Sequence, residues 1–375
     1  MNMRVYNTKK DCCGCMVCVD ICPKGAISKK RDFFGFDYPV IDKTLCIQCG
    51  ACTKVCAFSE KKEPNTFEIR AYAVKNKNSE ARMKSSSGGI YTALTDYVIE
   101  KGGVVYGAAF VSKSDVAHIR CEDVENRNRT RTSKYVQSDC EGIYNRIKQD
   151  LREGKIVLFS GTPCQVGAVK KMFGDCNGNL LLVDIICHGV PSPMLFNKHI
   201  NYIEKKANKK VKEFVFRTKN GNGRNSDPSI IYEDGTADSE SKYIGMFSAL
   251  FNENKILRES CFNCNYASNT RQGDITIGDF WGVENSMPEF QDGFGVSAVI
   301  INSIVGKQLF ENIKNDIEYK ETSFKEIARK NPNLLKPSKR PKYPTFWIKY
   351  IFMGWNGIVE SYQKKSLINK IKKRM

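Results

Sequence analysis

Two four-cysteine runs with the same internal spacing, both inside residues 12–56, restrict the fold of this chain more than any other feature. The first run is Cys12-x2-Cys15-x2-Cys18-x3-Cys22, followed by Pro23, and the second is Cys46-x2-Cys49-x2-Cys52-x3-Cys56. Three thiolates at this tight spacing wrap one face of a compact iron–sulfur cubane, and the fourth points away toward a second cluster. The two runs therefore predict two [4Fe–4S] clusters.

The same pattern assigns the ligands, because in two-cluster ferredoxins the fourth cysteine of each run serves the other cluster. One cluster is assigned to Cys12, Cys15, Cys18 and Cys56, and the other to Cys46, Cys49, Cys52 and Cys22. Zinc is the alternative, but zinc sites use separated CxxC pairs and not complete x2, x2, x3 runs. Cys13 is an extra thiol in the first run and is given no role.

A chain of 375 residues is too long for this module alone and predicts two or three domains. We expect a bacterial-type ferredoxin fold over residues 1–63, with a polar linker at 59–68. A mixed α/β and α+β body follows, with an N-terminal part at 66–180 and a C-terminal part at 181–335.

Hydrophobic patterning supports this division. In the first part, strands at 69–76, 104–111, 156–161 and 179–187 alternate with helices that follow 84–89 and cover 141–155 and 165–174. Ile90, Leu94, Tyr97 and Val98 fall on one face of the first of these helices. The second part is less regular, with strands at 211–220, 229–235, 274–282 and 295–303 and a helix at 307–315.

Seven further cysteines lie outside the ferredoxin runs, and four of them occupy distinctive local contexts. Cys164 lies in a strand-to-helix turn, Cys187 ends an apolar strand, and Cys261 and Cys264 form a CxxC pair. Four such thiolates could bind a third cluster. The alternative is a set of buried free cysteines with an isolated CxxC pair. Cys121, Cys140 and Cys176 are expected to lie outside this third site.

Six motifs in fixed order make residues 66 to about 335 similar to the beta subunit of coenzyme F420 hydrogenase/dehydrogenase. They are KSSSGG at 84–89, KYVQS at 134–138, GTPCQ at 161–165, CHGVPS at 187–192, the CxxC pair at 261 and 264, and GDITIGDFWG at 273–282. The resemblance implies a domain that binds FAD and a [4Fe–4S] cluster and passes electrons between iron–sulfur centres and a substrate. Relatives act on different substrates, so it implies the electron chain and not the substrate.

A flavin site is also suggested by the residues themselves. The turn Ser85, Ser86, Ser87, Gly88 and Gly89 precedes a helix, where free amides, hydroxyls and helix polarity suit a pyrophosphate, although such turns also serve simply as helix caps. Thr162 and Gln165 could hydrogen-bond a flavin ring edge. Arg258, Asp274, Asp279 and Trp281 are expected around the same pocket.

The sequence therefore predicts a flavin-dependent iron–sulfur oxidoreductase with a small-molecule substrate or coenzyme. The alternative is a non-catalytic electron-transfer subunit that relays electrons to a partner enzyme, with polysaccharide biosynthesis as one setting. The expected partner is a ferredoxin or another oxidoreductase subunit. The net charge of +18 raises the question of nucleic acid, but no recognisable nucleic-acid-binding fold accompanies it.

The location is expected to be cytoplasmic, because no apolar run is long enough to span a membrane and the N-terminus lacks a signal-peptide pattern. The tail at 336–375 holds eleven Lys or Arg residues against one acid. It also carries six apolar residues that we single out: Phe346, Trp347, Tyr350, Ile351, Phe352 and Trp355. We expect these apolar residues to pack on the body. Any membrane association is then at most peripheral, at the inner face.

Overall fold

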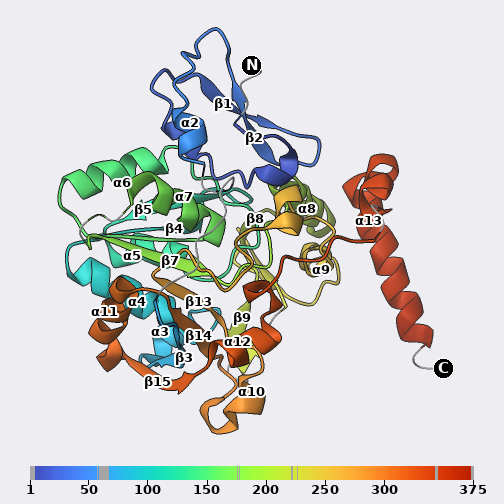
Figure 1. Ribbon diagram of the computed structural model, residues 1–375. Helices are drawn as coiled ribbons and strands as arrows, with labels where there is room; N and C mark the ends of the chain where they lie inside the picture. The colour runs from blue at the N-terminus through green and yellow to red at the C-terminus, as the bar shows by residue number, and fades with distance from the viewer. Residues whose placement is uncertain are drawn as a thin grey trace.

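The computed structural model describes residues 5–56, 58, 67–174, 176, 178–220, 223–225, 227–342 and 345–372. Figure 1 shows three parts: a small N-terminal module at the top, a mixed α/β body below it, and a C-terminal helix at one side. The mixed class expected for the body is confirmed. Residues 59–66 of the expected linker lie outside the described residues.

The N-terminal module consists of a hairpin and two short helices that follow the cysteine loops. Its elements are η1 (Lys9–Asp11), α1 (Val17–Asp20), β1 (Ile27–Arg31), β2 (Asp37–Ile41) and α2 (Ala51–Lys54). Strands β1 and β2 pair antiparallel, with Ile27 opposite Ile41. Gly14 and Gly50 have φ of 73° and 74°, a left-handed conformation that suits glycine and curls each loop before its helix. The repeat in the sequence is therefore a repeat in the structure.

The body is organised around a mixed sheet, which in the described part of the chain has eight strands in the order β15-β3-β14-β13-β7-β6-β4-β5. These are β3 (Arg70–Asn76), β4 (Val104–Phe110), β5 (Val116–Cys121), β6 (Val157–Gly161), β7 (Leu180–Ile185), β13 (Ile275–Asp279), β14 (Ser297–Ile301) and β15 (Ile317–Thr322). Strands β4, β6, β7 and β13 are parallel neighbours, so their carboxyl ends meet at one edge of the sheet. Ligands of open α/β sheets bind at such an edge.

Helices cover both faces of this sheet. Helices α4 (Ile90–Glu100) and α11 (Ile304–Asn312) pack on one face, and α6 (Ile143–Arg152), α7 (Pro163–Phe173) and α12 (Phe324–Lys330) pack on the other. The predicted apolar face of α4 is buried at Ile90, Leu94 and Val98, while Tyr97 is half-buried. Smaller helices α3 (Ser79–Met83), α5 (Val124–Thr130) and α10 (Val283–Ser286) fill the connections.

The two expected parts of the body, 66–180 and 181–335, share one central sheet. The predicted strands at 274–282 and 295–303 become β13 and β14 and insert between β7 and β3, so the sheet draws on both parts. The intervening residues form an aromatic-rich lobe with its own core. Its elements are α8 (Pro193–Ala207), β8 (Val211–Val215), β9 (Thr218–Asn220), β10 (Gly223–Asn225), β11 (Ser229–Tyr232), β12 (Ala237–Asp238) and α9 (Met246–Asn252).

The C-terminal helix α13 (Thr345–Lys372) packs one side against this lobe and is kinked at Gly354. Of the six apolar residues expected to pack on the body, Phe346 and Trp355 are buried and Trp347 and Tyr350 are half-buried there, whereas Ile351 and Phe352 are 62% and 84% exposed. Ile358 and Val359 are buried as well. The side chains after Lys364 lie outside the described residues. In the described part of the chain, no helix combines the length and apolar character that crossing a membrane requires.

Candidate functional site

The cysteines of the N-terminal module separate into two groups in space. Cys22 of the first run lines one small pocket together with Cys46, Cys49 and Cys52 of the second run. The thiols of Cys12, Cys15, Cys18 and Cys56 lie close enough for their charges to interact with one another. The two groups match the exchange of fourth cysteines that the spacing predicts for two clusters.

Arg258 fixes the first group of cysteines to the body. Its guanidinium is fully buried and donates from Nε to the Cys12 carbonyl at 2.9 Å and from NH2 to the Asp37 carbonyl at 2.9 Å. NH1 donates to Gln137 Oε1 at 3.0 Å, and NH2 lies 3.8 Å from Cys12 Sγ. The ring of Tyr38 lies beneath it, 4.1 Å from the guanidinium carbon. Among the described residues no carboxylate pairs with this buried cation.

Gly14 makes this contact possible, because a Cβ at that position would lie 2.7 Å from the Arg258 guanidinium. The position of Arg258 differs from the prediction. The sequence placed it around the flavin pocket, but it lies between the N-terminal module and the body instead. Asp274 also lies elsewhere, where its carboxylate accepts from the Leu182 amide and the Ser303 hydroxyl.

The four later cysteines, far apart in sequence, line one pocket, which we call the cysteine pocket. Cys164 lies in the first turn of α7, Cys187 follows β7, and Cys261 and Cys264 lie in and just after the 3-10 helix η2 (Glu259–Asn263). Cys13, given no role by the sequence, lines the same pocket. Cys121, Cys140 and Cys176 do not; they pack in the cores beside the central sheet.

The chemistry of these thiols suits a metal cluster. Burial raises the pKa of Cys261 to about 12 and that of Cys264 to about 11, so alone they would stay protonated at neutral pH. A bound metal stabilises the thiolate. No three His, Cys, Asp or Glu side chains of the described residues surround a point suitable for a single ion.

A buried ion pair lies beside the cysteine pocket and connects two of the segments that form it. Arg271 and Asp184 pair at 2.9 Å with side chains that are 1% and 0% exposed. Asp184 ends the strand that leads to Cys187 and also accepts from the amides of Gln272 and Gly273. Arg271 donates to the carbonyls of Tyr266 and Ile185. The pair therefore ties the segment that carries Cys187 to the loop that follows Cys264.

A cavity of about 490 Å³ opens at the carboxyl edge of the parallel strands and shares a wall with the cysteine pocket, formed by residues 187–190 and Asn333. Of the residues predicted for flavin, all but Gly88, Arg258 and Asp274 line it: Ser85, Ser86, Ser87, Gly89, Thr162, Gln165, Asp279 and Trp281. Gly88 instead packs into the sheet, where a Cβ would lie 2.2 Å from the Val74 carbonyl and 2.5 Å from the Ser297 amide.

The Ser/Gly turn is held by its own hydroxyls, which limits what they can offer a ligand. Ser85 donates to the Ala81 carbonyl at 2.7 Å and Ser87 to the Val296 carbonyl at 2.8 Å. Ser86 accepts from the amide and the hydroxyl of Ser133, at 2.8 and 3.2 Å. Because each hydroxyl has one proton, only that of Ser86 is left to donate into the cavity.

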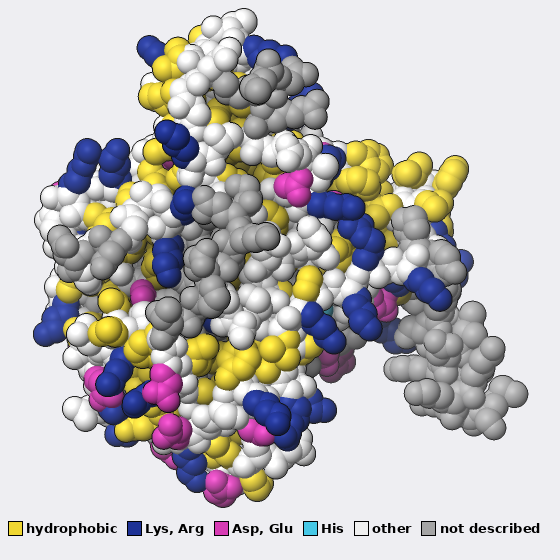
Figure 2. Space-filling view, in the orientation of Figure 1, with side chains coloured by type: hydrophobic (Ala, Val, Ile, Leu, Met, Phe, Trp, Pro, Cys, Tyr) yellow, Lys and Arg dark blue, Asp and Glu magenta, His cyan; other side chains and the backbone are white. Residues whose placement is uncertain are grey.

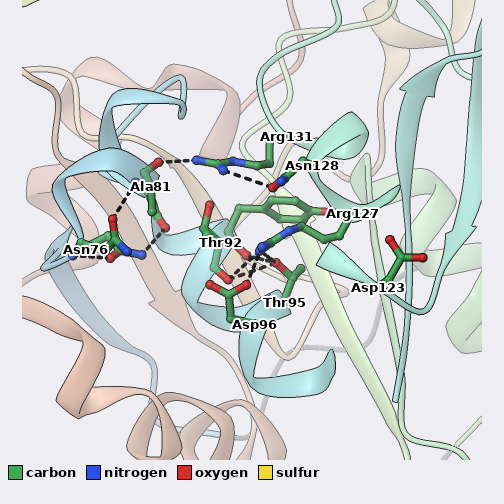
Figure 3. Close-up of polar contacts among 12 residues, drawn as sticks. Asn76, Ala81, Thr92, Thr95, Asp96, Asp123, Arg127, Asn128 and Arg131 are labelled. Atoms are coloured by element: carbon green, nitrogen blue, oxygen red, sulfur yellow. Dashed lines mark hydrogen bonds and ion pairs between the residues drawn. The ribbon is translucent and has the colours of Figure 1, made fainter. Parts of the chain in front are cut away.

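Basic residues after α5 complete this end of the cavity, and sequence reasoning missed them. Arg131 donates to the Ala81 carbonyl just before the turn, and Arg127 joins α5 to α4 through Asp96 and Thr95, as Figure 3 shows. Lys134 lies in the cavity wall, donates to the Arg131 carbonyl, and has its pKa lowered to about 7 by burial. The KYVQS motif begins at Lys134, so the sequence could have indicated this lysine as a site residue.

Two more predicted residues, Gln165 and Asp279, are also engaged with protein groups, and Asp279 lies opposite Ser297 beside the Ser/Gly turn. Gln165 accepts from the Thr162 amide at 3.0 Å and donates to Cys140 Sγ at 3.2 Å, so it shapes the turn before α7. Asp279 forms an ion pair with Arg217, whose guanidinium carbon lies 5.4 Å from the centre of the Trp281 ring. This pair neutralises the carboxylate that the sequence offered as a ligand.

Two segments of the chain match known protein families. Residues 154–326 match the family described as the C terminus of the coenzyme F420 hydrogenase/dehydrogenase beta subunit, and residues 11–59 match the 4Fe-4S dicluster domain. No curated protein matches. One solved structure, a xenon derivative of the F420-reducing [NiFe] hydrogenase complex from Methanosarcina barkeri, aligns at 19% identity and a TM-score of 0.48, over 72% of this chain and 89% of that one. Residues 154–326 therefore carry the region described as the C terminus of the coenzyme F420 hydrogenase/dehydrogenase beta subunit, and residues 11–59 carry a 4Fe-4S dicluster domain.

Proposed function

We propose that this chain is an iron–sulfur flavoprotein oxidoreductase that passes electrons between two ferredoxin-type [4Fe–4S] clusters and a small-molecule substrate, with a third cluster and FAD in the body. The observation that carries the proposal is the shared wall. The cysteine pocket and the large cavity meet along residues 187–190, so a cluster in one lies beside a flavin in the other. Short separations of this kind are what electron transfer between cofactors requires.

The ligands proposed for the third cluster are Cys164, Cys187, Cys261 and Cys264. The first cluster would lie close by, because Cys13 lines the cysteine pocket and packs with Cys15 and Cys56. The order of centres is then the outer cluster of the N-terminal module, the inner cluster at Cys12, the third cluster, and the cavity.

FAD, when bound, interconverts single-electron and hydride-type two-electron transfers. The chain's own residues would hold its pyrophosphate at the Ser/Gly turn, where Ser86 can donate a hydrogen bond and Lys134 supplies positive charge. Thr162 lines the cavity, and its hydroxyl lies 3.2 Å from Cys164 Sγ of the cysteine pocket. Asp279, paired with Arg217, adds no net charge to the cavity wall.

Replacing Cys261 with serine tests the third cluster. The full-length variant, purified without oxygen, is expected to contain about four fewer irons per chain than the wild type, because a cubane lacking one thiolate is not retained. The matched control is Cys176→Ser, since Cys176 is half-buried but lies outside the cysteine pocket. Equal iron content in the Cys261→Ser variant and the wild type would remove the third cluster from the proposal.

Replacing Lys134 with glutamine tests the pyrophosphate site. A lost charge-assisted hydrogen bond weakens binding by about 1.5–3 kcal/mol, which is about a 10- to 100-fold rise in the Kd for FAD by fluorescence titration. Wild-type affinity should fall as pH rises through about 7, because Lys134 loses its proton there and the bound phosphates favour the charged form. The variant should lose this pH dependence.

The control for this titration is Lys170→Gln, an exposed lysine on α7 outside the cavity, which should leave the Kd unchanged. Wild-type protein with its clusters intact that binds no FAD would contradict the flavin assignment. The remaining function would then be that of a non-catalytic relay to a partner enzyme.

A further inference from the structure

The second group of cysteines lies at the outer end of the N-terminal module, next to solvent. The module is attached to the body through its other side, where Arg258 holds the Cys12 carbonyl, the Tyr144 hydroxyl donates to the Cys15 carbonyl, and Asp20 accepts from the Gly142 amide. The pocket of Cys22, Cys46, Cys49 and Cys52 belongs to the second cysteine group, and Cys49 is exposed. In Figure 1 the module projects from the body, which leaves this end accessible.

Two aliphatic side chains flank the exposed cysteine. Leu45 is 52% exposed and Ile47 is 57% exposed, and Ile47 lines the pocket beside Cys49. Exposed aliphatic residues are common singly, but two beside an exposed thiol of a predicted cluster form a small apolar centre. A transient electron-transfer interface needs only such a small contact, because it must release its partner after each transfer.

The surroundings of this centre are positively charged. Lys24 lines the pocket, and Lys43 and Lys54 lie on the two segments that flank it; all three are exposed. Residues 21–56 contain three acids. Two of them form ion pairs, Asp32 with Lys9 and Asp37 with Arg31. The third, Asp42, accepts hydrogen bonds from Thr44 that lower its pKa, so it stays a carboxylate, and this end carries three lysines against this one acid. On the face seen in Figure 2, the module shows dark blue and yellow side chains at its outer end.

We propose that this outer end, which we call the outer face and define by Leu45, Ile47, Cys49 and Lys24, Lys43 and Lys54, is the docking site of a small acidic iron–sulfur electron-carrier protein. The inference rests on the proposed function, since it needs a cluster in the second cysteine group. A lysine rim selects an acidic partner and speeds its encounter, and the apolar centre brings the two clusters together. In each encounter one electron leaves the reduced carrier and enters the outer cluster; no bond or proton changes hands.

The test uses the full-length chain with its clusters and a photoreduced acidic [2Fe–2S] ferredoxin as the carrier. A variant with Lys24→Glu, Lys43→Glu and Lys54→Glu is mixed with it in a stopped-flow instrument. The second-order rate constant for cluster reduction is expected to fall at least ten-fold at low ionic strength, with the difference shrinking as salt screens the charges. Because the ferredoxin is negatively charged, exchanging lysines for glutamates should repel it, so the experiment tests an acidic partner.

The matched control reverses three exposed lysines of the body, Lys148, Lys198 and Lys212, and so changes the net charge by the same amount. Its rate constant should change much less than that of the outer-face variant. Equal effects of the two variants would overturn the proposal, and so would an outer-face variant that reacts as fast as the wild type. A double variant, Leu45→Ser with Ile47→Ser, should slow transfer even at high salt; full activity there would also overturn it.

Reduction by a small viologen separates this proposal from the function beneath it. A viologen needs no protein interface, so every variant should still be fully reduced by it. If the wild type accepts electrons from neither source, the proposed function fails. If viologen works and the ferredoxin does not discriminate among the variants, only the outer face fails as a docking site.

Discussion

Replacing Asp184 with asparagine is expected to lower the free energy of unfolding by about 3–5 kcal/mol, because it leaves the buried Arg271 guanidinium without its counter-charge. The variant should also lose the third cluster, because the pair ties the segment of Cys187 to the loop after Cys264. Anaerobic denaturant titration followed by circular dichroism measures the first effect, and iron analysis measures the second.

The control for this experiment is Asp234→Asn. Asp234 pairs with Lys209 at 2.9 Å, but both side chains are exposed, so its loss should destabilise the protein much less than the loss of Asp184. Equal destabilisation by the two substitutions would show that burial does not determine the importance of the Asp184 pair. Normal iron content in Asp184→Asn would show that the cysteine pocket does not depend on it.

Replacing Arg258 with methionine is expected to lower the midpoint potential of the cluster at Cys12 most, and that of the third cluster less, because the guanidinium charge also acts on Cys164 and Cys261. A buried cation favours the reduced cluster, which carries more negative charge, and methionine removes that cation while keeping much of the side-chain length. The loss of hydrogen bonds to Cys12, Asp37 and Gln137 should also cost about 3 kcal/mol of stability. Redox titration monitored by electron paramagnetic resonance measures the potential.

Arg340→Met is the matched control for Arg258→Met. Arg340 also lies over an aromatic ring, with its guanidinium carbon 4.6 Å from the centre of Phe262, but it is exposed and pairs with Glu259. Its removal should leave every cluster potential unchanged. Potentials in Arg258→Met that equal those of the wild type would contradict the electrostatic role given to the buried guanidinium.

Local spacing allowed the sequence to predict the cysteine chemistry. The x2, x2, x3 runs predicted the grouping of Cys22 with Cys46, Cys49 and Cys52, because short loops leave few ways to arrange thiols. Strands and helices of the body were also predictable from apolar periodicity. The place of β13 and β14 inside the sheet was not, because strand order depends on pairing between distant segments: β13 pairs with β7, 92 residues away at Ile275 and Val183, and β14 pairs with β3, 223 residues away at Ser297 and Val74.

The polar residues of the site were harder to predict, since a side chain's role depends on which partner reaches it in the fold. Gln165 and Asp279 were expected to face a flavin, but each is engaged by another protein group, Cys140 in one case and Arg217 in the other. Arg258 was placed at the wrong site because nothing in its local sequence reveals the distant Cys12 carbonyl that it binds. Gly88 was counted with its turn, although its backbone packs into the sheet.

The most direct test of the proposed electron chain is the cofactor content of the full-length wild-type protein purified without oxygen. Acid-labile sulfide, iron and extracted flavin are measured on the same sample, and spins are counted by electron paramagnetic resonance after reduction. Three cubanes and one flavin predict about twelve irons and one FAD per chain. About eight irons with no flavin, even after reconstitution with iron, sulfide and FAD, would contradict the account and leave a two-cluster relay.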